Sequence, residues 1–346
     1  MGGNTQERAV PVSICLTTYN RASALPATID SLLAQSFGNF ELIISDDCSS
    51  DATESVCREY AARDPRIQYF RNSQNLRMPG NLNSAIRRCR GEYIANLHDG
   101  DVYRPDLIEK WKAALDQQPN APFVFNAYRW CPGNGRSELV QQFQDVRVEG
   151  NIIARQFFET LTSCVWGTVM ARASAYNDAG LFNPAFGFIS DVDMWLRLAR
   201  NKSVAYVPEP LIHLTGREAK HPYAYFHWRY LYWQYAIYVA NWPFYQPILG
   251  SIHSPSEYRR RMRLRFLRGM ALSVKHRKWD RVQEGLAIWR KSDDPVLRAL
   301  ARVVNLRSSV PEWYSADYWC DIQFPGAKMN AVKYTTGTGL TAESQD

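Results

Sequence analysis

The sequence contains no long hydrophobic run. No segment reaches the roughly 18 consecutive apolar residues that a membrane-spanning helix needs. The opening residues, MGGNTQERAV, carry no apolar stretch of the kind that forms a secretory signal. Gly2 does not begin a myristoylation signal, because Gln6 stands where that signal requires Ser or Thr. These absences predict a protein that is not threaded through a membrane.

The seven cysteines form no CxxC pair, and their odd number leaves one over. A secreted domain framed by disulfides uses an even set of cysteines at regular spacings. We therefore expect a cytoplasmic protein. Internal repeats and low-complexity segments are also absent, while 46% of the residues are hydrophobic, which is enough for a sizeable buried core. The chain is globular, with one large domain and an extension.

Short β-type runs alternate with helical patterns over the first 130 residues, which is typical of βαβ units around a parallel sheet. The predicted strands are Val12 to Thr17, Glu41 to Ser45, Arg66 to Phe70, Glu92 to Leu97 and Pro122 to Asn126. In such α/β sheets, ligands bind beyond the carboxyl ends of the strands. The residues that directly follow each strand are therefore the candidates for function.

Polar and acidic clusters follow three of these strands. Thr17, Thr18, Tyr19, Asn20 and Arg21 end the first, Asp46 to Asp51 end the second, and His98 to Asp101 end the fourth. Because parallel strands end at one edge of a sheet, these clusters should converge there.

Asp99 and Asp101 flank a glycine on a predicted tight turn. Their hard oxygen ligands can hold Mg²⁺ or Mn²⁺ against phosphate oxygens, and the cation would neutralise a leaving diphosphate. Asp46 and Asp47 could accept hydrogen bonds from a base or ribose, whereas Asp51 is better explained as a helix-capping turn residue.

Three further residues, near the first and fourth strands, each admit two explanations. Tyr19 could lie against a base ring or simply pack at the strand end. Asn81 and Asn83 could line a donor site or cap the helix before the fourth strand.

Asp191 lies in ISDVDMWLRLAR, on the same helical face as Trp195 and Leu198. A carboxylate on a largely apolar segment is partly desolvated, which raises its basicity toward that of a general base. Asp193 projects about 160° further around the helix and is expected to pair with Arg197. The sequence therefore favours Asp191 as the reactive acid.

Four ordered segments resemble the family 2 glycosyltransferases of the GT-A fold over about residues 11 to 215. They are VSICLTTYNRASALPATIDSLLAQSF, ELIISDDCSSDAT, NLRMPGNLNSAIRRCRGEYIANLHDGDVYRPDLI and GLFNPAFGFISDVDMWLRLA. The resemblance implies donor contacts at Thr17, Tyr19 and Asp46, a diphosphate-bound cation near Asp101, and a base at Asp191. Most members of this family invert the configuration of the anomeric carbon.

The chain departs from the family pattern in two places. Adjacent acids would occupy positions 100 and 101 in the common form, but only Asp101 is in frame here, and Asp99 is the candidate for the second carboxylate, from a shifted turn. After Pro210, the family often carries a His on a loop over the diphosphate, and here His213, Arg217 and His221 are the candidates. The candidate donor-binding residues are thus Thr17, Tyr19, Asn20, Arg21, Asp46, Asn81, Asn83, Asp99 and Arg217, and the candidate metal ligands are Asp99, Asp101 and His213.

Beyond the catalytic domain, placed at residues 1–220, the composition changes. Residues 223–248 are densely aromatic, and much of the formal charge of +7 falls between Arg259 and Arg307. We expect a helical extension over residues 221–330 and a flexible tail over 331–346. The aromatic and basic stretch either binds an anionic membrane surface or packs on the catalytic domain, closing the acceptor cleft or forming a homodimer.

The sequence thus predicts an α/β protein with a GT-A-like, mostly parallel sheet, flanking helices and a C-terminal helical extension. The predicted function is inverting transfer of a sugar from a UDP-, GDP- or dTDP-sugar to a glycan or lipid-linked acceptor, with Mn²⁺ or Mg²⁺ as cofactor. Two alternatives remain. A nucleotidyltransferase would need a glycine-rich phosphate loop, which TTYNRASAL lacks. A non-catalytic module on the same scaffold would bind carbohydrate or, through the basic helices, nucleic acid, although no nucleic acid partner is expected.

Overall fold

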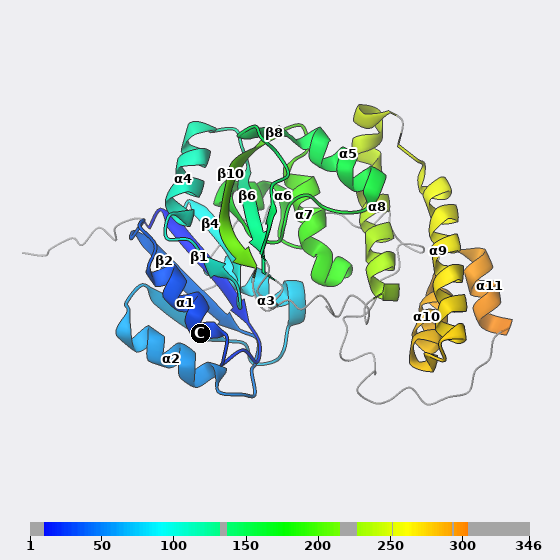
Figure 1. The fold of residues 1–346 in the computed structure, drawn as a ribbon, viewed down its shortest axis with the longest axis horizontal. Coiled ribbons are helices and arrows are strands. Elements are labelled where there is room, and N and C mark those ends of the chain that lie inside the picture. The colour runs from blue at the N-terminus through cyan, green and yellow to red at the C-terminus, as the bar shows by residue number, and fades with distance from the viewer. Residues whose placement is uncertain (1–9, 132–136, 215–226, 251, 293, 304–346) are drawn as a thin grey trace, which may run out of the picture.

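One mixed sheet organises the first two thirds of the protein, and four helices follow it (Figure 1). The structure, a computed structural model, describes residues 10–131, 137–214, 227–250, 252–292 and 294–303. The strands of the sheet lie in the order β3-β2-β1-β4-β9-β6-β10-β5, with β7 paired to β6 and β8 paired to β10. The predicted fold class, an α/β protein with a C-terminal helical extension, is confirmed.

The N-terminal half of the sheet is parallel. Its strands are β3 (Ile67–Arg71), β2 (Phe40–Asp46), β1 (Val12–Thr18) and β4 (Tyr93–His98), joined through α1 (Leu25–Leu33), α2 (Thr53–Arg63) and α3 (Arg77–Ile86). The register pairs Thr17 with Ser45 and with His98, so the three strands end together. This alignment brings the polar clusters that follow β1, β2 and β4 to one edge of the sheet.

The other half of the sheet mixes strand directions. β9 (Val169–Arg172) is antiparallel to both β4 and β6 (Phe123–Trp130), while β10 (Ser203–Leu214) runs parallel to β6. The short strands β5 (Val102–Tyr103), β7 (Glu138–Val140) and β8 (Arg147–Glu149) complete it. The five strands predicted from sequence all form, as β1, β2, β3, β4 and β6.

Helices cover both faces of the sheet because the strands alternate buried side chains toward each face. Val12, Ile14 and Leu16 pack with α1, α2 and α4 (Leu107–Gln117). Cys15, between them, packs on the opposite face with α3, α5 (Gly150–Thr160), α6 (Ala173–Ala179) and α7 (Ser190–Leu198). A 3-10 segment kinked at Gly187, η1 (Pro184–Ile189), leads into α7.

The C-terminal helices are α8 (His227–Leu249), α9 (Pro255–Lys275), α10 (Trp279–Lys291) and α11 (Pro295–Val303). The aromatic side chains of α8 are mostly buried in a core shared with α5, η1 and α7. Burial of these aromatic side chains favours the explanation that they pack on the catalytic domain, since side chains packed inside the protein cannot also insert into a bilayer. Among the described helices, none is long and apolar enough to cross a membrane.

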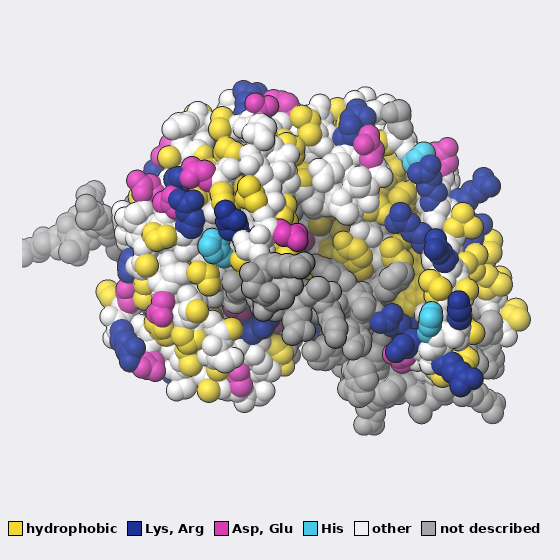
Figure 2. Space-filling view, viewed as in Figure 1, with side chains coloured by type: hydrophobic (Ala, Val, Ile, Leu, Met, Phe, Trp, Pro, Cys, Tyr) yellow, Lys and Arg dark blue, Asp and Glu magenta, His cyan; other side chains and the backbone are white. Residues whose placement is uncertain are grey.

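The basic residues of the extension behave differently from its aromatic residues. Figure 2 shows dark-blue side chains gathered on the surface of the C-terminal helices.

The predicted boundary near residue 220 falls between β10 and α8, outside the described residues, as does the predicted tail over 331–346. Both stay predictions.

Candidate active site

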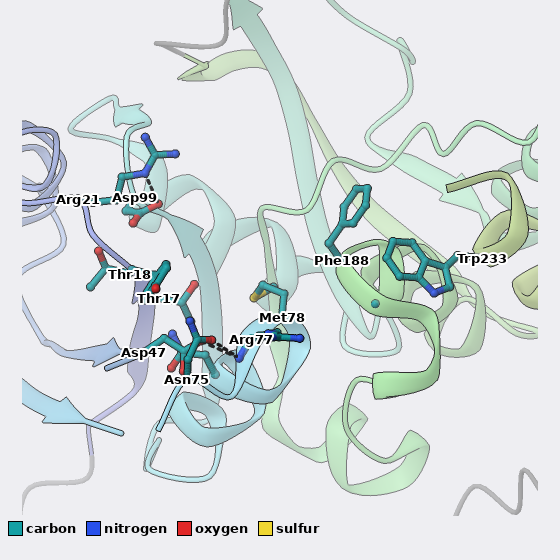
Figure 3. Close-up of a pocket in the computed structure, with 13 residues that line it drawn as sticks. Thr17, Thr18, Arg21, Asp47, Asn75, Arg77, Met78, Asp99, Phe188 and Trp233 are labelled. Atoms are coloured by element: carbon teal, nitrogen blue, oxygen red, sulfur yellow. Dashed lines mark hydrogen bonds and ion pairs between the residues drawn. The ribbon is translucent and has the colours of Figure 1, made fainter. Parts of the chain in front are cut away.

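A cleft of about 570 Å³ opens at the carboxyl ends of β1, β2 and β4 (Figure 3). One end is polar and the other apolar. The polar end is lined by Thr17, Thr18, Tyr19, Arg21, Asp47, Asn75, Arg77, Asn81 and Asp99, and the apolar end by Met78, Gly187, Phe188 and Trp233. A concave site with few polar groups on rigid elements is the usual form of a small-molecule site.

The end of β1 supplies one wall of the cleft. Thr17 and Thr18 face into it, and the ring of Tyr19 is 41% exposed beside them. Asn20 has a different task, because its Oδ1 accepts a hydrogen bond from the backbone N–H of Ser50 at 2.8 Å. The positive φ of Asn20, 51°, turns the chain so that Arg21 also lines the cleft. Asn20 therefore shapes the wall of the cleft without lining it.

Asp46 and Asp47 separate at the end of β2. Asp46 is fully buried, and its carboxylate accepts hydrogen bonds from the Ser49 backbone N–H at 3.0 Å and the Tyr69 hydroxyl at 2.8 Å. Asp47 lies at the cleft, where its carboxylate accepts from the backbone N–H groups of Leu76 and Arg77, both at 2.7 Å. Asp46 is held by its partners at the strand ends, so Asp47 is the carboxylate of this pair that lines the cleft.

Asp51 stands one residue before the N-cap of α2, which is Ala52. Its Oδ1 accepts a hydrogen bond from the Thr53 backbone N–H at 3.0 Å, at the start of α2. This contact confirms the turn predicted at Asp51, but the cap position itself belongs to Ala52.

The two asparagines of α3 also differ in position. Asn81 lines the cleft and is held by Ser45, whose hydroxyl donates to its Oδ1 at 2.7 Å. Asn83 is buried away from the cleft and exchanges two hydrogen bonds with the Phe182 backbone, at 2.8 and 3.0 Å. Asn83 therefore ties α3 to the segment before η1 and does not line the cleft.

The loop before α3 contributes residues that sequence reasoning missed. Asn75 and Arg77 both line the cleft, and Arg77 has a positive φ of 58°. Both stand in NLRMPGNLNSAIRR, part of a segment that resembles the family, but neither residue was singled out there. They reach the cleft because Asp47 binds the backbone of their loop.

The turn after β4 holds the acids predicted to bind a cation. Asp99 lines the cleft, and its Oδ1 lies 3.9 Å from Nε of Arg21. Asp101 is buried, with its Oδ2 3.9 Å from Nδ1 of His98. Gly100, at φ +89°, supplies a turn that other residues rarely adopt, which explains why an acid does not stand there.

Asp99 and Asp101 fit a divalent cation that takes part of its coordination from the phosphates of a bound nucleotide. Among the described residues, no group of three His, Cys, Asp or Glu side chains is placed to hold a metal alone. Mg²⁺ or Mn²⁺ at a nucleotide site commonly uses one or two carboxylates and takes its other oxygens from phosphates. Asp99 lines the cleft, and Asp101, two residues further on, is fully buried and does not line it; the two carboxylates match that donor set in number.

Of the candidate residues after Pro210, the structure describes His213 but not Arg217. His213 lies on β10 opposite Val102, next in sequence to Asp101. Burial and the guanidinium groups of Arg129 and Arg104 lower the pKa of His213, so its imidazole is neutral at pH 7. Arg217 and the alternative candidate His221 lie outside the described residues.

Asp191 occupies the first turn of α7. Burial raises the pKa of Asp191 to about 6, and the backbone N–H groups of Asp191 and Val192 pull it the other way. A carboxylate with a pKa near 6 is ionised at pH 7 and still basic enough to take a proton. Desolvation therefore gives this residue the property expected of a general base.

Gly167 brings Asp191 close to the strand-end cluster. A methyl carbon placed on Gly167 would lie 2.6 Å from Cε1 of His98 and 3.2 Å from Oδ2 of Asp191. The carbonyl of Gly167 accepts a hydrogen bond from Nδ2 of Asn96 at 2.8 Å, which fixes this segment against β4. The imidazole and the carboxylate thus both lie against the side of Gly167 where a side chain would begin, and only glycine leaves room for both.

Gly167→Ala is expected to lower the rate of the reaction at this site, because the added methyl displaces His98 or Asp191. Displacement of a reacting group by about 1 Å can cost roughly 100-fold in rate. Gly38→Ala is the matched control, since a methyl carbon at Gly38 meets nothing within 4 Å. Steady-state kinetics of both variants checks the effect, and equal activity would contradict it.

Asp193 lies away from the cleft, as predicted. It is buried, and Nε of Arg197 lies 2.8 Å from its Oδ2. Asn241 of α8 donates to the other carboxylate oxygen at 2.9 Å. The predicted pairing of Asp193 with Arg197 is confirmed. The hydrogen bond from Asn241 joins α8 to α7, the helix that carries Asp191.

The apolar end of the cleft is built jointly by η1 and α8. Gly187, at φ +53°, lies under the indole of Trp233, where an added methyl carbon would be 2.4 Å from the ring. The Phe188 ring meets that indole edge to face, with ring centres 5.2 Å apart. Figure 3 shows both aromatic residues across the cleft from Thr17 and Asp47.

The family model for glycosyl transferase family 2 matches residues 13–180, which include the strand ends that form the polar wall of the cleft. An uncharacterized glycosyltransferase of Haemophilus influenzae is 34% identical over 211 residues, spanning 59% of this chain and 68% of the relative. The chain belongs to the family 2 glycosyltransferases. Of three further curated relatives, 30 to 32% identical, the chain spans just under two thirds of the length, 62 to 66%.

Solved structures agree with the family 2 assignment at the level of the fold. Staphylococcus aureus TarS 1–349 in complex with UDP-GlcNAc matches with a TM-score of 0.53 and 18% identity, over 66% of each chain. The mannosyltransferase PcManGT of Pyrobaculum calidifontis, in complex with GDP-Man and Mn²⁺, matches with a TM-score of 0.50 and 15% identity, over 86% of this chain and 88% of its own.

Proposed function

We propose that this family 2 protein transfers a sugar from a nucleoside-diphosphate donor to a hydroxyl of a glycan or lipid-linked acceptor, with inversion at the anomeric carbon. The observation that carries the proposal is the placement of Asp191, a carboxylate of raised pKa, against the same glycine as His98, at the end of β4. A base and a diphosphate site must adjoin for a single displacement, and the proximity of Asp191 to the end of β4 supports this proposal.

The donor lies at the polar end of the cleft. Thr17, Asp47 and Asn81 offer oxygen and amide partners to a base and ribose, and Tyr19 offers an exposed ring. Arg21 and Arg77 bring guanidinium groups that bind phosphate oxygens. The structural neighbours TarS and PcManGT bind UDP-GlcNAc and GDP-Man respectively, which supports a nucleotide-sugar donor.

Asp101 and Asp99 would hold a divalent cation against the diphosphate, where it would stabilise the negative charge that develops on the leaving group. The Mn²⁺ in the PcManGT complex supports this assignment. His213 pairs in the sheet with Val102, the residue that follows Asp101, and is the third candidate ligand.

Asp191 acts on the acceptor. Its carboxylate removes the proton of the acceptor hydroxyl as that oxygen forms a bond to the anomeric carbon, and the bond to the nucleoside diphosphate breaks on the opposite side. One displacement of this kind inverts the anomeric configuration. The apolar end, with Phe188 and Trp233, lies on the side of the cleft opposite the polar wall and suits a saccharide acceptor, whose C–H faces pack on aromatic rings.

A thermal-shift and hydrolysis experiment tests the function. A ligand that binds only the folded state stabilises it by about 2.7 kcal/mol at 100 times its Kd, so a nucleoside diphosphate with Mn²⁺ should raise the Tm. A screen of UDP, GDP and dTDP, each with Mn²⁺ and with EDTA, identifies the nucleotide. The matching nucleotide sugar should then be hydrolysed slowly without an acceptor.

The outcomes of this experiment separate the alternatives. A protein that binds no nucleoside diphosphate is not a transferase of this kind. Binding without hydrolysis or transfer indicates a non-catalytic scaffold. Release of pyrophosphate from a nucleoside triphosphate and a sugar phosphate indicates a nucleotidyltransferase.

A further inference from the structure

The positive charge of the chain is concentrated in one short stretch. Residues 259–281 contain ten Lys or Arg and one acid, Asp280, whereas the rest of the chain contains 31 Lys or Arg and 33 Asp or Glu. The formal charge of +7 therefore comes entirely from this stretch. It forms α9 and the first residues of α10.

Eight of the exposed residues of α9 form one continuous face. Placed about 100° apart along the helix, these eight span an arc of about 140°. Of the other exposed residues, Glu257 falls within the same arc, and Ser256 and Val274 lie just beside it. The eight are Arg260, Arg261, Leu264, Arg265, Arg268, Ala271, Leu272 and Lys275, and we call them the α9 outer face. Tyr258, Met262, Phe266 and Ser273 are buried on the inner side. The acid Glu257, in the first turn, is engaged with the Ser254 backbone N–H at 2.7 Å.

Large apolar side chains stand among these cations. Leu264 is 64% exposed and Leu272 is 46% exposed, on the same face as the arginines. Where α9 meets α10, Trp279 is 49% exposed beside the exposed Arg277 and Lys278. Figure 2 shows yellow and dark-blue side chains interleaved over these helices. Single exposed apolar side chains are common on soluble proteins, but these three large ones gather on one strongly basic surface, and such gathered apolar surface marks an interaction site.

The basic residues of the α9 outer face do not stabilise the fold through ion pairs within the described part of the chain. None of its five Lys or Arg residues makes an ion pair with a described acid. Arg263, directed toward the other helices, contrasts with them, since its Nε lies 2.9 Å from Oδ2 of the buried Asp294. Arg263 fastens α9 to α11, while the outer face presents its charge to the solvent.

We propose that the α9 outer face docks on an anionic lipid surface. Cations on a helix lying in the interface attract acidic headgroups, and leucine and tryptophan enter the boundary with the acyl chains. An acidic polymer would use the cations and leave the leucines in water. A second copy of this chain would bring two sets of cations together, which costs free energy. The proposal is independent of the sugar-transfer chemistry.

Flotation of the full chain with vesicles tests the proposal. The protein should float with phosphatidylcholine–phosphatidylglycerol vesicles at low salt, float less as salt rises, and not float with phosphatidylcholine alone. Each Lys or Arg near an anionic surface strengthens binding about fivefold, so Arg260→Gln, Arg261→Gln and Arg268→Gln together should weaken it about 100-fold.

A matched control carries Arg58→Gln, Arg63→Gln and Arg155→Gln. These arginines are exposed on α2 and α5, and their ion pairs are with acids on their own helices, although Arg58 also lies 5.3 Å from the ring centre of Tyr69. The control therefore loses the same three charges elsewhere. The control should float as the unaltered chain does. Equal loss of binding in the two triple variants would overturn the proposal, because net charge alone would then explain it.

A second variant, Leu264→Gln with Leu272→Gln, separates lipid from other partners. Both side chains are exposed, so folding should survive. Vesicle binding should fall severalfold, while binding to heparin stays unchanged. Unchanged vesicle binding would assign the face to an acidic polymer. Self-association lost in this variant, with no flotation of the unaltered chain, would assign it to a second copy, and either result overturns the proposal.

Discussion

Asp191→Asn is expected to cut the turnover number for sugar transfer by about 10²- to 10⁴-fold, because an amide cannot accept the proton of the acceptor hydroxyl. The exchange is nearly isosteric, so donor affinity measured by calorimetry should stay nearly intact. Asp191 lies in the first turn of α7, where burial raises its pKa to about 6. Single-turnover measurements of transfer test the effect directly.

Asp193→Asn is the control for this variant. Asp193 is buried between Arg197 and Asn241, so its replacement removes a charge partner from a buried guanidinium. Loss of one partner of a buried pair typically costs about 3–5 kcal/mol. Asp193→Asn should therefore lower the free energy of unfolding, with transfer largely retained by the molecules that fold. Near-normal transfer in Asp191→Asn, with Asp193→Asn folded but inactive, would reverse the assignment.

The pH dependence of the unaltered enzyme gives the base a second signature. The base must be ionised to accept a proton, so kcat/KM should fall about tenfold per pH unit below its pKa and level off above it. For Asp191 the bend should come near pH 6. The acid limb should disappear in Asp191→Asn, since no group of that pKa then governs the step.

Asp101→Ala is expected to abolish the dependence of nucleoside diphosphate binding on Mn²⁺. Asp101 lies at the turn after β4, and Asp99 beside it lines the cleft. Isothermal calorimetry with Mn²⁺ and with EDTA should give equal affinities in this variant and unequal ones in the unaltered chain. The cation bridges carboxylate and phosphate oxygens, so loss of the carboxylate removes its anchor.

Two further variants make the cation experiment decisive. Asp106→Ala removes an acid five residues further on, which pairs with Arg104 at 2.7 Å and should leave the Mn²⁺ dependence intact. Asp101→Asn preserves the shape of the buried side chain, so a loss of Mn²⁺ dependence there comes from charge and not from packing. Unchanged Mn²⁺-dependent affinity in both Asp101 variants would refute the assignment.

Several features of the fold could be predicted because they depend on local order in the sequence. The apolar runs of β1 to β4 and β6 gave the strands, and the polar residues after them marked the edge that became the cleft. The spacing within α7 distinguished Asp191 from Asp193, since the helical period sends the two carboxylates to different sides.

Other features arise from contacts between distant segments. Asp46 and Asp47 are adjacent in sequence, yet one is buried by Ser49 and Tyr69 while the other binds the loop at Leu76 and Arg77. Which carboxylate reaches the cleft depends on those partners. No periodicity could have identified Asn75 or Arg77, because the loop that carries them is positioned by Asp47.

The sequence by itself determined the α/β class, the strands and the order of the acidic motifs, because strand periodicity and residue order along the chain are local properties. Only the tertiary structure decided that His98 and Asp191 lie together against Gly167. It also decided that Trp233, 66 residues beyond that glycine, lines the apolar end of the cleft. These contacts join segments far apart in the chain, and their geometry follows from packing of the whole core.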